Sequence, residues 1–280
     1  MTLILSCLTP SAVYQVSDRR ITNLLPPGDV MDDEQNKAVM IGSRFAFAYN
    51  GLSEIAGECS DTWLARVISE SDTNDMAAVV NHIRTSANDA FQRITGPKKN
   101  RRHAFHGVGW LRLKGESDLS PASLRIHNAI DPLTWMWLPE AKDEFQLNTS
   151  WPSQFPDYCV MESVGVIPSL AEKAAVFSLV RRCVKRHTSN PATAREAMIR
   201  SLRWLSTRHR TIGPSAMAAC IPKRGVEEAE RTGRNVVFAG THSDLAPTFI
   251  YISATGSAKY FGPHFVSSGV SLTNFQGGAL

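Results

Sequence analysis

Residues 12–22 read AVYQVSDRRIT, an apolar run that ends in the polar sequence Asp18-Arg19-Arg20-Ile21-Thr22. β-branched and aromatic residues are typical of a strand, and Leu3 to Leu8 forms a second such run just before it. Thr9-Pro10-Ser11 separates the two runs as a turn does. The segment therefore predicts that the chain opens with a hairpin of two strands, whose charged residues lie where the second strand ends.

Further runs predict a mixed α and β protein. Strands are expected at Ala38 to Ile41, Phe45 to Tyr49, 103–113, 122–128, 157–163, 215–221, 235–239 and 248–253. Apolar residues at helical spacing predict two helices within 60–94 and two within 169–206. The capping box of Ser169 and Glu172 marks the start of the third helix. Because a helix pair follows each group of strands, we expect a four-layer αββα sandwich.

Composition shows no break that would divide the chain, so we expect a single domain of residues 1–280. Residues 131–156 are rich in Pro and Trp and are expected to form a surface insertion, in which the tryptophans pack the insertion itself. The Gly- and Ser-rich tail from about residue 262 is expected to be irregular.

Charge and cysteine content limit the classes of partner. The chain of 280 residues has 30 Lys and Arg against 26 Asp and Glu, and this small, dispersed excess argues against nucleic acid. Five cysteines without a C-x-x-C pair indicate neither a disulfide framework nor a zinc ribbon and favour a cytoplasmic location. No apolar run reaches the roughly 18 residues that span a bilayer, so no membrane partner is expected.

Three local patterns suggest chemistry but favour simpler interpretations. Residues 98–103, KKNRRH, form a basic cluster without interleaved aromatic residues, which is typical of a solvated loop. His103 and His106 form an H-x-x-H pair with no further ligand at metal spacing, so we expect no metal site. Residues 241–244, THSD, collect the residue types of a catalytic triad, but sequence neighbours rarely face one another, and a turn is favoured.

The start of the chain offers a different nucleophile. Met1 precedes Thr2, a residue small enough for removal of an initiator methionine. Removal would leave Thr2 with a hydroxyl and a free α-amine, whose ordinary pKa of about 7.7–8.0 suits a proton acceptor near neutral pH. One residue could then supply both nucleophile and base. Met-Thr alone is common, so the residues that follow decide its meaning.

Read in order, these residues are Thr2, Asp18-x-Arg20-x-Thr22 at the end of the second strand, Lys37 at the start of the third, and Gly51 after the next strand pair. This combination resembles the proteasome β-type family of N-terminal nucleophile hydrolases. The resemblance covers the N-terminal third by motif and the remainder by the order of helices and strands. It implies a threonine-type peptidase or amidohydrolase without metal or cofactor, acting on a peptide or amide substrate within a homo-oligomer such as a ring.

The resemblance also implies a role for each residue. Thr2 Oγ would attack the scissile carbonyl, its α-amine would move the proton, and the Gly51 backbone N–H would face the developing oxyanion. Lys37 would lie beside Thr2 as a cation held by Asp18. Arg20 would support this arrangement from behind.

Thr22 would align substrate through its backbone. The chain departs from the family at residues 208–214, RHRTIGP, where the family has an Asp and a Ser that help to hold the terminal amine. Thr211 is the residue available to replace the Ser, and residues 163–165, SVG, match the family's serine–glycine turn only loosely. Two alternatives therefore stay open: a catalytically inactive proteasome-like scaffold and a small-amide hydrolase of the same superfamily.

Overall fold

The computed structural model describes residues 2–22, 29–113, 115–131, 136–152, 155, 158–165, 169–186, 191–233, 248–252, 264–267 and 270–272. Within these residues, five α-helices and two large sheets form a mixed α+β structure, as the sequence predicts. Met1 and the predicted strand at 235–239 lie outside the described residues, as do the THSD segment and Trp135.

The first sheet has five antiparallel strands. Its order is β12 (Val160–Gly165), β1 (Leu3–Leu8), β2 (Ala12–Asp18), β13 (Ala216–Pro222) and β14 (Thr248–Ile252). The predicted hairpin is confirmed, because β1 and β2 pair with Ile4 opposite Ser17 and Leu8 opposite Val13. Every residue of β1 and β2 is buried, which explains their nearly continuous apolar character.

The second sheet has seven strands. Its order is β11 (Gln146–Ser150), β10 (Leu119–His127), β9 (Ala104–Arg112), β6 (Phe45–Asn50), β5 (Ala38–Ile41), β15 (His264–Ser267) and β16 (Val270–Leu272). Neighbouring strands are antiparallel except β5 and β15, which run parallel. Two small ribbons, β3 (Ile21–Thr22) with β4 (Val30–Asp32) and β7 (Glu54–Ile55) with β8 (Glu58–Cys59), lie outside both sheets.

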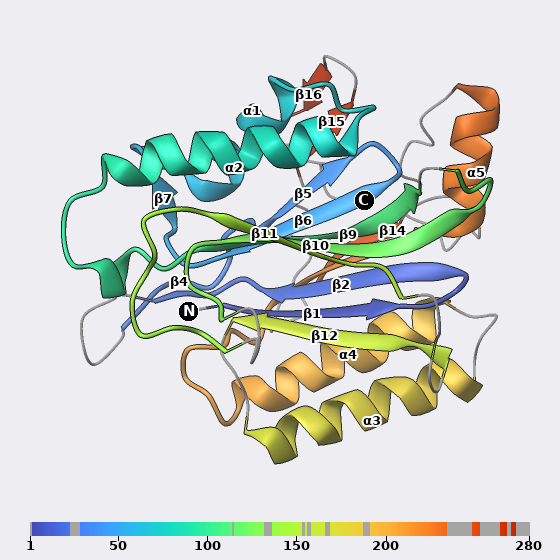
Figure 1. Cartoon of the computed structure of the whole chain (residues 1–280). Helices are drawn as coiled ribbons and strands as arrows, with labels where there is room; N and C mark the ends of the chain where they lie inside the picture. Colours follow the sequence, from blue (N-terminus) through green and yellow to red (C-terminus); the bar gives the residue numbers. More distant parts are fainter. Residues whose placement is uncertain are drawn as a thin grey trace.

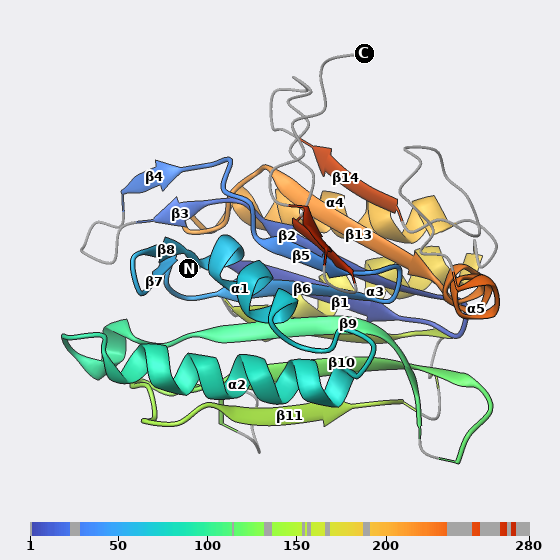
Figure 2. The same cartoon turned by 90° about the horizontal axis from the view of Figure 1, so that it is seen from above.

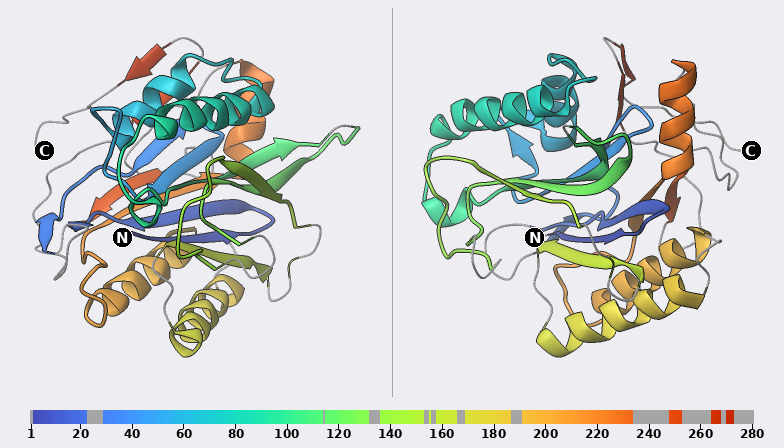
Figure 3. Two further views of the ribbon diagram at one scale, coloured as in Figure 1. Left: turned by 60° about the vertical axis from the view of Figure 1, so that its left-hand side comes forward. Right: turned by 45° about the vertical axis from the view of Figure 1, so that its right-hand side comes forward.

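The four predicted helices form two pairs on opposite sides of the sheets (Figure 1 and Figure 3). The helices α1 (Ser60–Ser69) and α2 (Met76–Gln92) lie over the seven-stranded sheet, and α3 (Leu170–Arg186) and α4 (Pro191–Ser206) cover the five-stranded sheet. The capping box of α3 is confirmed, because the Glu172 N–H donates to Ser169 Oγ and the Ser169 N–H donates to Glu172 Oε2. No described helix is long and apolar enough to cross a membrane.

Buried apolar side chains fill three spaces. One cluster joins α1 and α2 to the seven-stranded sheet through residues such as Trp63, Ile83 and Phe105. A second joins the five-stranded sheet to α3 and α4. A third lies between the sheets and includes Met40 and Trp110. The two sheets therefore face each other through side chains and are held at a fixed spacing.

Two expectations about elements are wrong, and one helix was not expected. The segment 131–156 is not only a surface insertion, because β11 within it pairs with β10 at the edge of the sheet. The tail is not irregular throughout, because β15 and β16 join the same sheet. A fifth helix, α5 (Lys223–Thr232), packs by only two buried residues, so it leaves almost no apolar pattern in the sequence. An edge strand such as QLNTS is half-exposed and polar, which hides its strand character in the same way.

Strand β15, which precedes β16 in the C-terminal part of the chain, is anchored by a buried polar contact. His264 Nε2 lies 2.8 Å from Asp61 Oδ2 at the start of α1. Gln35 Nε2 donates to the other carboxylate oxygen of Asp61 at 3.3 Å, and the Gln35 carbonyl accepts a hydrogen bond of 3.0 Å from Arg19 Nε. This chain of contacts leads from β15 to the end of β2, where the predicted site residues lie.

Candidate active site

Thr2 is buried at the end of the five-stranded sheet. It precedes β1, which lies between β12 and β2, so Asp18 at the end of β2 and Gly165 at the end of β12 are its neighbours. Figure 2 places this end of the molecule beside the β3–β4 ribbon. Thr2 is only slightly accessible to solvent.

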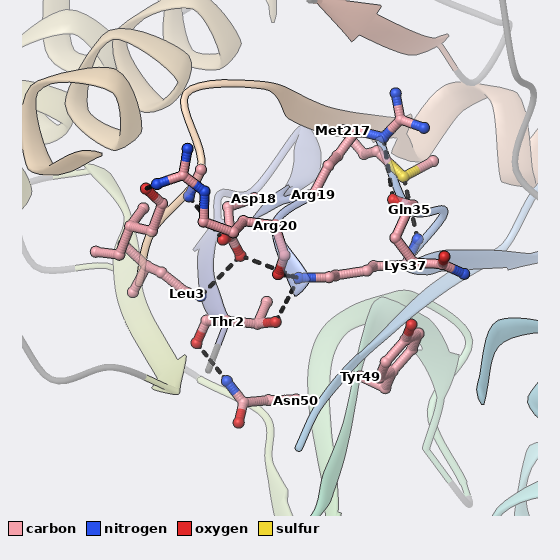
Figure 4. Close-up of polar contacts among 12 residues, drawn as sticks. Thr2, Leu3, Asp18, Arg19, Arg20, Gln35, Lys37, Tyr49, Asn50 and Met217 are labelled. Carbon is pink, nitrogen blue, oxygen red and sulfur yellow. Dashed lines mark hydrogen bonds and ion pairs between the residues drawn. The ribbon is translucent and has the colours of Figure 1, made fainter. Parts of the chain in front are cut away.

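Lys37 enters this site from the opposite sheet, just before β5 (Figure 4). Its side chain is fully buried, and Nζ donates to Thr2 Oγ1 at 2.6 Å and to the Arg20 carbonyl at 2.5 Å. The third neighbour is Asp18, whose Oδ1 lies 3.6 Å from the same nitrogen. The amine is thus held by three oxygens that fix its position against the hydroxyl.

Asp18 connects three segments of the chain. Its carboxylate is fully buried and accepts the Leu3 N–H at 3.0 Å through Oδ1 and the Gly213 N–H at 3.0 Å through Oδ2. The N-terminal strand, the loop before β13 and Lys37 therefore all meet at one side chain. A buried carboxylate is stable in the interior only when hydrogen-bond donors or a cation compensate for its lost hydration.

Burial shifts the pKa values of the pair. It lowers the pKa of the Lys37 ammonium below its ordinary value, and the Asp18 carboxylate opposes this shift. Burial also raises the pKa of Asp18, while Lys37 and the N–H groups of Gly213 and Leu3 act in the other direction. A lysine that loses its proton more readily, 2.6 Å from a hydroxyl, can accept that hydroxyl's proton.

Two residues contact the backbone carbonyl of Thr2, and the sequence does not predict that they meet there. Asn50 Nδ2 donates to the Thr2 carbonyl, and Gly165 packs against the same carbonyl. Gly165 has a φ of +109°, and a Cβ built on it would lie 1.8 Å from that oxygen. No signal in the sequence identifies Asn50, whereas the loose match at residues 163–165 already includes this glycine.

Two arginines fix the segment behind the site. Arg20 makes a two-pronged contact with Asp33, at 2.5 Å and 2.8 Å, and donates to the Arg210 carbonyl at 2.7 Å. Arg19 is buried and donates to the carbonyls of Gln35 and Glu34. Planar two-pronged contacts of this kind limit rotation as well as distance. Arg20 is thus placed where it can support the carbonyl that accepts from Lys37.

A cleft of about 650 Å³, open to solvent, leads to Thr2. Its lining residues come from both sheets, from the β3–β4 ribbon and from segments 98–102 and 136–138. They are Thr2, Arg20, Ile21, Thr22, Asn50, Gly51, Leu52, Ser53, Lys99, Asn100, Arg102 and Trp137. The predicted residues Thr22 and Gly51 thus line the cleft together with Thr2, within reach of a bound substrate.

Gly51 approaches the neighbouring backbone so closely that a side chain does not fit. Its φ is +128°, and a Cβ there would lie 2.4 Å from the Arg102 carbonyl oxygen. The next residue, Leu52, donates its N–H to His103 Nδ1 at 3.1 Å. The turn after β6 is therefore fixed against the start of β9.

The basic cluster at 98–103 has a second role that the solvated-loop interpretation does not include. It begins as a short 3₁₀ turn, Lys98–Asn100, and places Lys99, Asn100 and Arg102 on the cleft wall. Trp137, expected only to pack the insertion, lines the same wall. The order of residues along the chain does not reveal this contact, because the residues that they face precede them by about fifty positions or more.

The two histidines of the H-x-x-H pair have separate partners. His106 Nε2 lies 2.9 Å from Ser6 Oγ, whereas the His103 ring stacks on Tyr49. Burial lowers the pKa of His103 to about 3, so its ring is neutral. In the described part of the chain, no group of three or more His, Cys, Asp or Glu side chains could hold a metal ion.

Thr211 lies half-buried in the loop before β13, but it makes none of the polar contacts described for Thr2 or Asp18. The nearby Gly213 contributes a backbone N–H to Asp18 instead. A Cβ on Gly213 would lie 2.7 Å from the Arg20 Cβ, so this loop passes close to the site. In the described contacts it is therefore the Gly213 backbone, and not the Thr211 hydroxyl, that reaches Asp18.

Comparison with known proteins adds no family: no protein-family model matches the chain, and no curated protein matches it. The geometry around Thr2 is thus the basis for assigning a function.

Gly165→Ala tests whether the close approach of β12 positions Thr2. We expect the variant to lose about 1–3 kcal/mol more free energy of unfolding than Gly96→Ala, because overpacking adds to the backbone strain. Gly96 is the matched control, since its φ of +107° is nearly the same and a Cβ there would meet no atom within 4 Å. Chemical denaturation measures both, and equal losses would show that the contact with Thr2 is unimportant.

Proposed function

We propose that the protein is an N-terminal threonine hydrolase of the proteasome β type, acting on a peptide or amide substrate. The observation that carries the proposal is the 2.6 Å contact between Lys37 Nζ and Thr2 Oγ1, buried at the base of an open cleft. A hydroxyl, a lysine with a lowered pKa and a buried carboxylate form a nucleophile, a base and an orienting group.

The proposed fold is the four-layer αββα sandwich of N-terminal nucleophile hydrolases. Its support is the order of elements and the buried clusters that lie between the sheets and between each sheet and its helix pair. In such an arrangement the nucleophile belongs to one sheet and the lysine to the other. Thr2 directly precedes β1 of one sheet, and Lys37 directly precedes β5 of the other.

The proposed reaction begins with removal of the residue before Thr2. Thr2 Oγ then bonds to the carbonyl carbon, and its proton passes to Lys37 Nζ or to the freed α-amine. The Gly51 N–H would face the oxyanion. Collapse breaks the bond to the leaving nitrogen, which takes up the proton, and water hydrolyses the ester left on Thr2. Each step uses groups that line the cleft or lie buried at its floor.

The scaffold alternative rests on the missing Asp and Ser before β13. Two contacts weigh against it, because the Gly213 N–H and the Asn50 amide hold Asp18 and the Thr2 carbonyl in place. The small-amide hydrolase alternative has the same nucleophile and differs only in substrate.

Labelling by a peptide epoxyketone, which captures an N-terminal threonine, distinguishes an enzyme from a scaffold. Thr2→Ala should abolish labelling, and Lys37→Met should slow it by about 10²-fold or more, because general base assistance is lost. The wild-type rate should rise with pH, since both candidate bases, Lys37 and the freed α-amine, accept a proton only when neutral. Because burial lowers the pKa of Lys37, the midpoint should lie below the ordinary lysine value of about 10.4.

Lys98→Met is the control for loss of a lysine, since Lys98 pairs with the exposed Asp143 on the surface. It should label at the wild-type rate. Intact mass spectrometry follows each reaction at matched thermal stability. Labelling of Thr2→Ala at the wild-type rate would exclude the proposed nucleophile, and undiminished labelling of Lys37→Met would exclude Lys37 from the mechanism.

We further propose that the protein works as a homo-oligomer. The helices α3 and α4 expose apolar side chains. Leu170 is 85% exposed, and Leu179 and Trp204 are exposed in part. Exposed apolar groups favour association. Light scattering at micromolar concentration should give a mass several times the monomer's 30.8 kDa, whereas a monomer alone would contradict this proposal.

A further inference from the structure

We propose that the cleft selects substrates with a carboxylate beside the bond that is cleaved, and that Lys99 and Arg102 recognise it. This inference rests on the proposed function, because the cleft is the one that leads to Thr2. It concerns a different part of the site, however. The 3₁₀ turn and the residues after it form the wall of the cleft, whereas Lys37 and Asp18 lie buried at its floor.

The charge of the cleft is one-sided. Arg20, Lys99 and Arg102 are among its lining residues, and none of the described lining residues is acidic. Arg20 is neutralised by its two contacts with Asp33. The positive charge that a bound substrate meets therefore comes from Lys99 and Arg102.

Within the basic cluster at 98–103, some cations have an ion-pair partner and others do not. Lys98 Nζ lies 2.8 Å from Asp143 Oδ2, so its charge is paired. Lys99 is exposed, and among the described ion pairs none involves its ammonium. An unpaired cation next to a paired one, on the cleft wall, is what an external carboxylate needs.

Arg102 is held in place without being neutralised. Its Nε donates to the Lys99 carbonyl at 3.0 Å and its Nη1 to the Leu138 carbonyl at 3.2 Å, and the guanidinium carbon lies 6.0 Å from the centroid of the Trp137 ring. Carbonyls and an aromatic ring orient the group but carry no net charge. The described ion pairs include none for Arg102, so its positive charge remains available at the wall.

The remaining wall favours an amino-acid side chain over a larger anion. Ile21, Leu52 and Trp137 add apolar surface to the same cleft, and the Trp137 ring lies beside the Arg102 guanidinium. A short apolar stem with a terminal carboxylate, as in glutamate, matches this combination. Because Lys99 is exposed, salt screens its attraction, and the preference should be moderate, about tenfold, or ~1.4 kcal/mol.

The test compares fluorogenic peptide amides that differ only in Glu, Gln or Lys at the residue that supplies the scissile carbonyl, with a second set varied at the preceding residue. In one of the two sets, the wild type should cleave the Glu peptide with a kcat/KM about tenfold above that of its isostere Gln, and the Lys peptide most slowly. The advantage of Glu should shrink as salt rises, because the cations are solvent-facing.

Lys99→Gln and Arg102→Gln should each remove most of the Glu-to-Gln preference, and Lys99→Glu should favour the Lys peptide. Lys98→Gln is the matched control from the same turn and should keep the wild-type preference, because the charge of Lys98 is already paired. Equal kcat/KM values for Glu and Gln in both sets, unaffected by changes at Lys99, would overturn the inference.

A binding measurement separates this inference from the proposed function. Calorimetry on the unreactive Thr2→Ala variant should show about tenfold tighter binding of the Glu peptide, lost when Lys99→Gln is added. If that holds but the wild type cleaves no peptide, the carboxylate site stands and the hydrolase proposal fails. If the wild type cleaves Glu and Gln peptides equally through Thr2, the hydrolase stands and the carboxylate site is excluded. Absence of both binding and cleavage would overturn both.

Discussion

The buried carboxylate of Asp18 is the group on which the arrangement of this protein's site depends. It accepts the N–H groups of Leu3 and Gly213 and lies 3.6 Å from Lys37 Nζ. An ionised carboxylate in the interior costs several kcal/mol unless donors compensate it. The two N–H donors and the ammonium come from the first strand, the loop before β13 and the segment before β5, so a shift of any of these segments would leave the buried carboxylate less well compensated.

Packing of the two sheets brings Lys37 against Thr2, the candidate nucleophile. Thr2 directly precedes β1 and Asp18 ends β2 in the five-stranded sheet, whereas Lys37 precedes β5 and Asn50 and Gly51 lie at the end of β6 in the other. Side chains such as Met40 and Trp110 hold the sheets together in the interior. The spacing that this core sets places Lys37 Nζ within hydrogen-bond distance of the Thr2 hydroxyl. A substitution deep in the intersheet core would therefore change the geometry of the site without touching it.

The sequence predicts the parts of this structure whose signals are local. The hairpin and four helices follow from apolar runs and from residue types at their ends, whereas the expectation that Lys37 lies beside Thr2 and Asp18 comes from the resemblance to the proteasome β-type family. The contacts of Asn50 and Gly213 could not be predicted, since they depend on close approach between distant segments. Asn50 donates from its side-chain amide, and Gly213 donates from a backbone N–H that almost any residue carries. The polar edge strand β11 escapes prediction because one of its sides faces solvent, and the exposure of Lys99 gives it the pattern of a solvated loop residue.

The most direct test of the account is to locate the bond that an epoxyketone forms with the wild-type protein. Tandem mass spectrometry of the digested adduct should place the inhibitor on a peptide that begins at Thr2. The adduct should involve both the hydroxyl and the α-amine of that residue, because this reagent class closes a ring with the two groups. An adduct on any other side chain, or a protein that keeps the residue before Thr2 and does not react, would contradict the claim that Thr2 is the nucleophile.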